Sequence, residues 1–506
     1  MMRIANITIV VILMLTVLFS VLACSKADND NAENNKRPAK TADAGSSGPE
    51  TEAKPERYTP DLPDIDFGGY EFLAIISTDN IYGPFTFNVE EENGDTINDA
   101  VYKRNRLIEE KYNVVLKQRE MDLWALESTL KKSVTASSED FDVCMQIDRY
   151  GYSLGYQGYI LPAENLPYMD LSRPWYVRDV NESLSVGGKH YIIFSDECLN
   201  MYGLNLAICF NKSLVKDLGL ESPYELVKSG KWTYDKFAEM CKAAAFDVDG
   251  NGVMTDADRY GVLSADNWIP SNFWVCAGIE TVVKDGDGVL RLNLAGNTKL
   301  LDMLEKAREI LFGGEKIYFS NGNDKTSTFS VRETTYGNTD ISFQQFESNL
   351  GLFFSTLINT IPMMRSFEVD FGIIPFPKAN ENQERYYTRN GGGFPLMVPA
   401  HIENPERTSI IVEAVAAQSK NTTLPAYKEI NLRTKYARDE ESVEMLDMIF
   451  ENSFMELGDV MFLDDISRLI VDEIRGKGNF TSLFEKNEAK FQKVLDKVND
   501  AAAGLN

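Results

Sequence analysis

The chain has 506 residues, with 51 Lys and Arg against 77 Asp and Glu, which gives a formal net charge of −26. A surface this acidic repels phosphate backbones and anionic lipid headgroups, so the composition excludes nucleic acid as a partner and favours a neutral ligand. Hydrophobic residues make up 43% of the sequence, and a chain of this length is expected to fold as two lobes rather than around one core.

The first 23 residues have the pattern of a cleaved export signal. Arg3 precedes an apolar run over residues 7–15 that is too short and too poorly flanked for a permanent membrane span. The run ends in Val-Leu-Ala-Cys at residues 21–24, which resembles the box read by the bacterial lipoprotein pathway. That resemblance implies cleavage before Cys24, a diacylglyceryl group on its sulfur and a further acyl chain, such as palmitate, on its amine. A plain secreted protein with a chance cysteine is the alternative.

Residues 24–60 are expected to form a disordered tether. They contain one aromatic residue and no branched aliphatic residue, so they cannot bury enough apolar surface to fold. A flexible chain of this length reaches roughly 35 Å between its ends. The expected location is therefore the extracellular face of the bacterial cytoplasmic membrane, with membrane contact through the lipid anchor only.

The first half of the folded chain predicts an α/β lobe. Short apolar strands are expected at residues 70–76, 113–117 and 141–147, and helices are expected to begin at Thr96, within a capping box that ends at Asp99, and at Leu123. Strands that alternate with helices in this way are typical of a mainly parallel sheet.

A second set of elements begins near residue 205. Strands are expected at residues 205–211, 352–354, 371–375 and 395–399, with helices from Ser213 and over 233–245. Asn404 followed by Pro405 predicts a capped helix start. Residues 267–274 are interpreted as a loop, and from about residue 425 the pattern is almost wholly helical, including 442–453 and 481–502.

Five cysteines remain once Cys24 is assigned to the lipid, namely Cys144, Cys198, Cys209, Cys241 and Cys276. An odd number in apolar surroundings favours free buried thiols over disulfides, and their spacing fits no zinc site.

The sharpest local motif is an acidic loop over residues 247–258. It offers oxygen ligands at the positions of a calcium-binding loop, namely Asp247, Asp249, Asn251, Val253 through its carbonyl, Thr255 and Asp258. Aspartate in place of glutamate at the last position predicts weak affinity, about 10⁻⁴ to 10⁻³ M. The loop would hold a structural Ca²⁺ in the second lobe, and an unmetallated surface turn is the alternative.

Several stretches together resemble a known family. They are residues 210–223, 230–237 and 371–378, followed by Asn404-Pro-Glu-Arg, Glu413-Ala and residues 435–442. In this order and spacing they resemble the extracellular solute-binding proteins of ABC transporters, family 1, the carbohydrate type. The resemblance implies an α/β, two-lobe periplasmic-binding-protein-like fold of class II type with helical C-terminal additions.

By the same resemblance, lobe 1 would comprise residues 67–203 plus 378–421, and lobe 2 residues 204–377 plus 422–506. The hinges would lie near residues 200–204, 375–378 and 421–425. The two lobes would close over a ligand held between them, which needs only a few residues to absorb the rotation.

Sugar binding requires flat aromatic faces and planar polar groups rather than a short consensus. Candidates in loops and crossing segments are Tyr82, Arg149, Tyr150, Asp196, Glu197, Tyr202, Trp268 and Trp274. Of these, Asp196 is favoured for hydrogen bonding and Trp268 for stacking.

No motif for catalysis is found: the sequence lacks Gly-x-Ser-x-Gly, P-loop and His-Glu-x-x-His patterns. The resemblance therefore predicts a monomeric, membrane-anchored, extracellular receptor that captures a sugar or oligosaccharide for ABC permease subunits. A surface glycoside hydrolase or lyase lipoprotein, and a receptor for a peptide or other solute on the same fold, are the alternatives.

Overall fold

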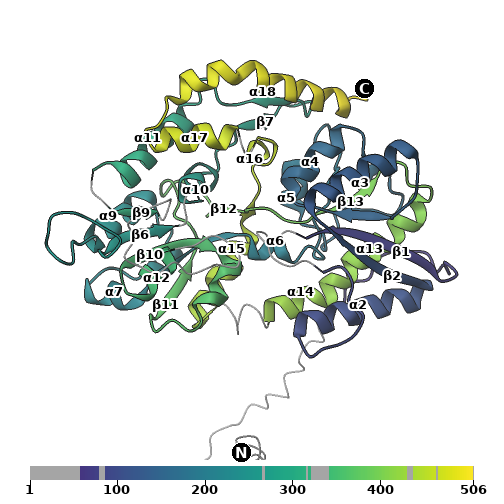
Figure 1. The fold of residues 1–506 in the computed structure, drawn as a ribbon, viewed down its shortest axis with the longest axis horizontal. Helices are drawn as coiled ribbons and strands as arrows, with labels where there is room; N and C mark the ends of the chain where they lie inside the picture. The colour runs from purple at the N-terminus through teal and green to yellow at the C-terminus, as the bar shows by residue number, and fades with distance from the viewer. Residues whose placement is uncertain are drawn as a thin grey trace, which may run out of the picture. The chain divides into compact units, whose positions relative to one another are not determined.

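The structure, a computed structural model, describes residues 57–78, 86–264, 268–314, 317–320, 341–429, 437–462 and 465–504. They belong to one compact unit, Arg57–Asn506, in which two five-stranded sheets are each surrounded by helices (Figure 1). The predicted signal, Cys24, most of the predicted tether and Tyr82 lie outside the described residues. In the described part, no helix combines the length and apolar character needed to cross a membrane.

The first sheet has the strand order β2-β1-β3-β13-β4. Its strands are β1 (Tyr70–Ser77), β2 (Val114–Met121), β3 (Val143–Met145), β4 (Ile160–Leu161) and β13 (Leu396–Pro399). β1 pairs in parallel with β2 and β3, while β13 runs antiparallel to β3 and β4. The predicted mainly parallel sheet is confirmed.

The helices around this sheet are α2 (Thr96–Tyr112), α3 (Leu123–Ala136), α4 (Asp148–Tyr156), α5 (Arg178–Leu184) and α13 (Pro405–Asn421), with the 3₁₀ turn η1 (Ala163–Asn165). The predicted start of α13 is confirmed, since the Asn404 side chain accepts a hydrogen bond from the backbone N–H of Arg407 at 2.9 Å. The predicted cap of α2 is wrong by one residue. Asp95 rather than Thr96 caps it, because the Asp95 carboxylate accepts the first free backbone N–H groups.

The second sheet has the order β11-β5-β10-β6-β9. Its strands are β5 (Leu206–Asn211), β6 (Tyr260–Ser264), β9 (Tyr318–Ser320), β10 (Gly351–Leu357) and β11 (Phe371–Ile374). β6 pairs in parallel with β9 and β10, whereas β5 runs antiparallel to β10 and β11. Around it lie α7 (Lys212–Asp217), α8 (Pro223–Lys228), α9 (Tyr234–Ala244), α10 (Trp268–Cys276), α11 (Thr298–Phe312), α12 (Ile341–Glu347) and the 3₁₀ helix η2 (Ile358–Met364).

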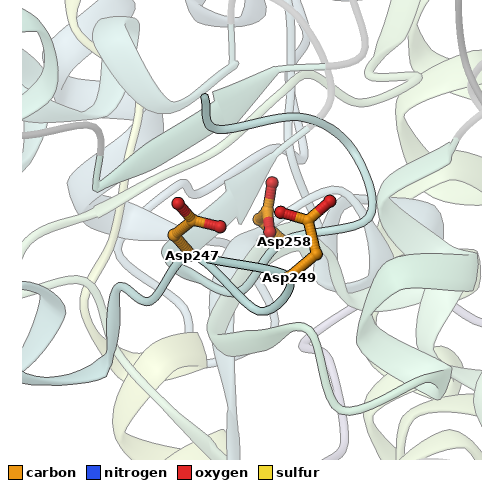
Figure 2. A group of neighbouring side chains, drawn as sticks. All are labelled: Asp247, Asp249 and Asp258. Carbon is orange, nitrogen blue, oxygen red and sulfur yellow. The ribbon is translucent and has the colours of Figure 1, made fainter. Parts of the chain in front are cut away.

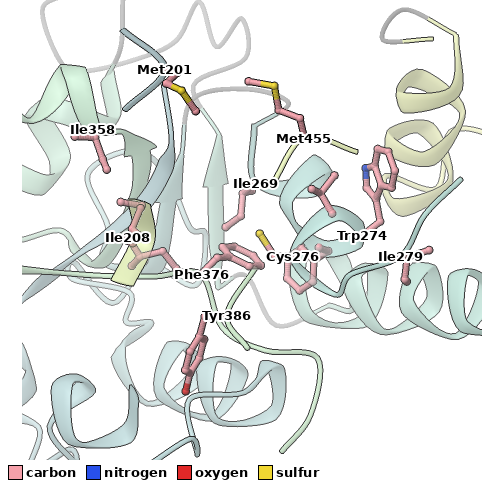
Figure 3. Close-up of a cluster of buried hydrophobic side chains, with 14 of the residues drawn as sticks. Met201, Ile208, Ile269, Trp274, Cys276, Ile279, Ile358, Phe376, Tyr386 and Met455 are labelled. Atoms are coloured by element: carbon pink, nitrogen blue, oxygen red, sulfur yellow. The ribbon is translucent and has the colours of Figure 1, made fainter. Parts of the chain in front are cut away.

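Aromatic side chains form much of the core on one face of the second sheet. Trp232 packs against Phe237 and Phe353, with ring centroids 5.9 and 5.3 Å away. Its indole N–H donates to the carbonyl of Pro375 at 3.0 Å. Figure 3 shows how this core continues into α10, where Ile269 and Cys276 lie near Phe376 and Trp274 lies farther along the same cluster.

The five cysteines that the structure describes, Cys144, Cys198, Cys209, Cys241 and Cys276, are free and buried, as predicted. Burial raises the pKa of each thiol, and that of Cys276 to about 12. These groups are therefore neutral packing side chains.

Smaller elements and the C-terminal helices complete the fold. They are α6 (Asn200–Gly203), the hairpin β7 (Val282–Lys284) and β8 (Leu290–Leu292), the pair β12 (Thr388–Arg389) and β14 (Ser453–Phe454), α14 (Thr423–Ala426), α15 (Glu440–Glu451), α16 (Leu457–Met461), α17 (Ile466–Ile474) and α18 (Phe480–Ala502). Figure 1 shows α18 lying alongside α17 and the β7–β8 hairpin. Asn499 of α18 holds β8 through hydrogen bonds to both backbone groups of Leu290.

The described chain passes between the two sheets through residues 195–205 and 390–394. A third passage lies between α14, which packs on α2 and α13, and α15, which packs on β11, and so comes after the expected residues 421–425. The first two crossings are joined by a hydrogen bond of 2.7 Å from the Gly391 N–H to the Leu204 carbonyl. The second crossing lies later than the expected residues 375–378. Residues 378–387 remain with the second sheet's layers, because the Lys378 N–H donates to the Trp232 carbonyl at 3.0 Å and the Tyr386 hydroxyl to the Val227 carbonyl at 3.2 Å.

Candidate functional site

The carboxyl ends of β1, β2 and β3 lie at one edge of the first sheet, because these strands are parallel. α3 begins directly after β2, and α4 soon after β3. The second crossing meets this edge: Asp148, the first residue of α4, donates its N–H to the Gly393 carbonyl at 3.0 Å and accepts the Gly393 N–H at 3.2 Å. In open α/β sheets, ligands bind outside the carboxyl ends of the strands, so this edge is the first place to search for a site.

Two aromatic rings form a surface at this edge. The rings of Trp124 and Tyr150 meet edge to face, with centroids 5.2 Å apart and planes at 73°. Trp124 is 63% exposed, although it is a large apolar side chain, and Asp122 fixes its backbone by accepting its N–H at 2.9 Å. An exposed indole braced by a second ring offers the flat apolar face on which a sugar ring stacks.

An open groove of ≈ 730 Å³ extends from Trp124 along α3, lined by Trp124, Glu127, Ser128, Lys131, Lys132, Thr135 and Ala136. Tyr150 is among the predicted ligand residues, whereas Trp124 is not. The sequence did contain a signal for Trp124, because this residue comes shortly after a predicted strand and the helix-capping residue Asp122. At such a position the start of a helix lies at the edge of a sheet.

Arg149, next to Tyr150, is held by protein carboxylates. Its guanidinium lies 3.3 Å from Asp148 Oδ1 and 3.4 Å from Asp459 Oδ2 of α16. Asp459 also accepts from Arg389 of β12 at 2.9 Å. The four side chains are at most 9% exposed, so two arginines and two aspartates neutralise one another in the interior.

Asp196 and Tyr202 form part of a joint between the first and third crossings. The Tyr202 hydroxyl donates to Asp196 Oδ1 at 3.1 Å, and Lys420 at the end of α13 lies 3.1 Å from Asp196 Oδ2. The Tyr202 ring packs against Tyr427 and Phe450. Because Asp196 is 3% exposed and Tyr202 8%, both are directed into this joint in the described conformation.

Glu197 is buried beside the same joint. Among the residues that the structure describes, neither of its carboxylate oxygens has a hydrogen-bond partner, and burial raises its pKa to about 7, a shift that the positive charge of Arg104 opposes. Arg104 is itself fully buried, and its guanidinium donates to Phe87, Asn105 and Ser419.

The expected loop over residues 267–274 is wrong, because from Trp268 onward the chain forms α10. Trp274 is 0% exposed within the core (Figure 3), so it presents no open face to a ligand. The backbone of Trp268 begins α10, but its side chain lies outside the described residues, as does Tyr82. Of the eight predicted ligand residues, Tyr150 is therefore the one whose described side chain lies in an exposed aromatic pair, and the ligand roles of all eight stay predictions.

The acidic loop brings three carboxylates together. Oxygens of Asp247, Asp249 and Asp258 lie within 4.8 Å of one another (Figure 2). Asp247 accepts the backbone N–H of Gly252 at 2.6 Å, and this bond is the main reason that its pKa lies below the ordinary value. Asp258 is buried and accepts the Val248 N–H at 2.8 Å, which ties the two ends of the loop together.

The remaining predicted ligands of the loop also contribute to its shape. The Asn251 amide donates to Asp249 Oδ2 at 2.7 Å, and its oxygen accepts the Val253 N–H at 2.7 Å. Thr255 donates both its N–H and its hydroxyl to Asp258. Convergent carboxylates with amide and hydroxyl oxygens nearby form an all-oxygen donor set, which fits Ca²⁺ rather than a softer metal.

Two five-stranded sheets joined by three crossing segments define the two-lobe α/β fold of the periplasmic-binding-protein type, with helical C-terminal additions. No protein-family model matches this chain, and no curated protein matches it. Solved structures do. Mycobacterium tuberculosis UspC has a TM-score of 0.53 and 12% identity, over 85% of this chain and 100% of that one.

Two further solved structures were determined with saccharides. The ABC substrate-binding protein Lmo0181 of Listeria monocytogenes, in complex with cycloalternan, has a TM-score of 0.51 and 11% identity over 85% of this chain and 99% of that one. The GacH receptor of Streptomyces glaucescens, studied with acarbose, has a TM-score of 0.51 and 13% identity over 84% and 99%. At these identities the likeness is one of fold.

Proposed function

We propose that this protein is an extracellular solute-binding protein that captures a sugar or oligosaccharide for import by an ABC transporter. The observation that carries the proposal is the exposed Trp124, braced by Tyr150 at the carboxyl edge of the first sheet. An exposed indole at the edge where this class of fold places ligands is suited to a pyranose ring. A ligand that contacts both lobes favours the closed arrangement through its differential affinity for that arrangement.

Charge and the related structures support a neutral saccharide. The formal charge of −26 disfavours anionic ligands, and the Listeria and Streptomyces proteins of the same fold were solved with cycloalternan and acarbose. The same proposal includes two further points: the receptor interacts with the permease subunits of the transporter, and it is a monomer.

The test is a thermal-shift screen followed by calorimetry with cycloalternan, acarbose, maltotriose, maltotetraose and a set of short peptides. A ligand that binds only the folded protein raises the melting temperature. We expect one saccharide class to bind with one-to-one stoichiometry and to be recovered unchanged by chromatography. Trp124→Ala should weaken that binding, while the control Phe312→Ala, which removes a 42% exposed aromatic from α11, should not.

Other outcomes would select another function. Cleavage products from any saccharide would support the glycoside hydrolase or lyase, and a shift with peptides alone would support a peptide receptor.

The proposal places the domain outside the cell on a lipid anchor at Cys24. Two or more acyl chains hold a protein stably at a membrane, where a single chain does not. We expect mass spectrometry of the protein expressed in a bacterial host to find acyl chains on an N-terminal Cys24. Cys24→Ala should move the domain from the membrane fraction to the soluble exported fraction, and an unmodified Cys24 in membrane-bound protein would contradict the anchor.

The acidic loop is proposed to bind a structural Ca²⁺ in the second lobe. The convergence of Asp247, Asp249 and Asp258 supports this proposal, because a divalent cation would offset their mutual repulsion. With a dissociation constant of about 10⁻⁴ to 10⁻³ M, 10 mM Ca²⁺ should stabilise the fold by about 1.4 to 2.7 kcal/mol. Asp249→Asn should reduce the stabilisation that Ca²⁺ produces. The exposed control Asp287→Asn should be stabilised by Ca²⁺ as much as the unmodified protein. Mg²⁺ should not stabilise the unmodified protein.

A further inference from the structure

One carboxylate links the C-terminal helices to the edge that carries Trp124 and Tyr150. Asp459 of α16 accepts from Arg389 Nε at 2.9 Å and Nη2 at 3.2 Å, from Arg149 Nη2 at 3.4 Å and from the Ser467 hydroxyl at 2.8 Å. Burial works to raise its pKa, but the charges of Arg389 and Arg149 outweigh burial, and the pKa lies below the ordinary value. The group is therefore an ionised buried acceptor shared by two arginines.

α16 packs against α4 and is also held from the side of β7 and α17. Its cap, Glu456, accepts the Asp459 N–H at 2.7 Å and the Thr281 N–H at 2.8 Å, which fastens α16 beside β7. Asp459 thus lies on a short helix that is held at β7 through Glu456 and packs against α4.

The first turn of α4 carries the other side of this contact. Ile147 provides no side-chain cap for the helix, and Arg149 in its first turn is held by Asp148, by Asp459 and by the Asn390 carbonyl at 3.4 Å. At Gly392, an added Cβ would lie 2.8 Å from Arg149 Nη1, so the second crossing packs directly on the guanidinium. Tyr150, the next residue along the chain, carries the ring that braces Trp124.

We propose that Asp459 is a positioning residue for the ligand site: through Arg149 it sets the position of Tyr150, and through Tyr150 the orientation of the Trp124 indole. The expected effect on sugar binding rests on the proposed function. The expected effect on the orientation of Trp124 does not, because that orientation can be measured without any ligand. The C-terminal helices then act on the site without contacting the sugar.

The test measures the near-ultraviolet circular dichroism of Trp124, isolated by subtracting the spectrum of the same protein with Trp124→Phe. We expect Asp459→Asn to reduce this signal at least twofold and to increase acrylamide quenching of Trp124. The matched control is Asp465→Asn, which removes a nearby surface carboxylate paired with Lys490 at 2.7 Å and should leave the Trp124 signal unchanged. The double variant Arg149→Gln/Asp459→Asn should be no worse than the more severe single variant, because both changes break one path.

Sugar affinity supplies the second readout, with maltotetraose as the first probe. Asp459→Asn should weaken binding about tenfold, equivalent to about 1.4 kcal/mol, and Ser467→Ala should have the same effect to a smaller extent. If Asp459→Asn does not fold, the Trp124 spectra of Ser467→Ala and Arg149→Gln test the inference in its place. An unchanged Trp124 spectrum in folded variants overturns the inference even if their melting temperature falls. If no saccharide binds the unmodified protein, the proposed function fails, while the spectra still decide the role of Asp459.

Discussion

Two tryptophans, each in a helix that follows a strand, have opposite exposures to solvent. Trp124 in α3 follows β2 and is 63% exposed, whereas Trp274 in α10 follows β6 and is 0% exposed. Trp124 is the second residue of its helix, and Trp274 is the seventh. A helix that returns over a sheet has its first turn at the sheet edge, while a residue almost two turns later lies over the sheet itself.

An aromatic residue that follows a strand is therefore not by itself a ligand candidate, since it is exposed in one case and part of the core in the other. Position along the helix does not decide alone either, because Ile269, the second residue of α10, is 0% exposed. Trp268, the first residue of α10, lies as close to the start of its helix as Trp124 does, and its stacking role stays a prediction.

The largest expected effect is on stability, from Trp274→Ala. Removing a fully buried indole leaves a cavity and should lower the free energy of unfolding by about 3–5 kcal/mol. Trp124→Ala, at an exposed position, should change it by about 0.5 kcal/mol or less. Urea denaturation followed by far-ultraviolet circular dichroism measures both, and equal losses would break the contrast between the two positions.

The sequence predicted the sheets well because hydrophobic strands and caps are local signals. Asn404 with Pro405 set the start of α13, and Thr233, the first residue of the helix predicted over 233–245, accepts the N–H of Lys236 as the cap of α9. The site was harder to predict. Asp196 and Arg149 were plausible hydrogen-bonding groups, yet Lys420 and Asp459, distant in sequence, hold them inside the protein. No local pattern reveals which carboxylate or cation the fold will bring to such a residue.

The next effect concerns the buried crossing region and its dependence on pH. Burial raises the pKa of Glu197 from 4.5 to about 7, so between these values the folded state retains a proton that the unfolded state has released. Its contribution to stability is therefore full below about pH 4.5 and is lost as the pH rises through 7, with a slope of at most about 1.4 kcal/mol per pH unit.

Glu197→Gln should remove this part of the slope. Glu413 and Glu456 also have a pKa raised to about 7 by burial, so the measured quantity is the difference in slope between variant and unmodified protein over pH 5–8. Glu110→Gln, at an exposed position of α2, is the matched control. Parallel stability curves for Glu197→Gln and the unmodified protein would show that Glu197 is ionised throughout this range.

The smallest effect tests whether Trp268, at the start of α10, contacts the ligand as Trp124 is proposed to do. Trp268→Ala should weaken saccharide binding about two- to tenfold, since an aromatic stacking contact contributes about 0.5–1.5 kcal/mol, and should cost far less stability than Trp274→Ala. Calorimetry and urea denaturation on the same preparations separate the two quantities. If Trp268→Ala instead destabilises the fold as much as Trp274→Ala and leaves affinity unchanged, then the start of α10 belongs to the core, and the carboxyl edge of the first sheet alone supplies the aromatic contact.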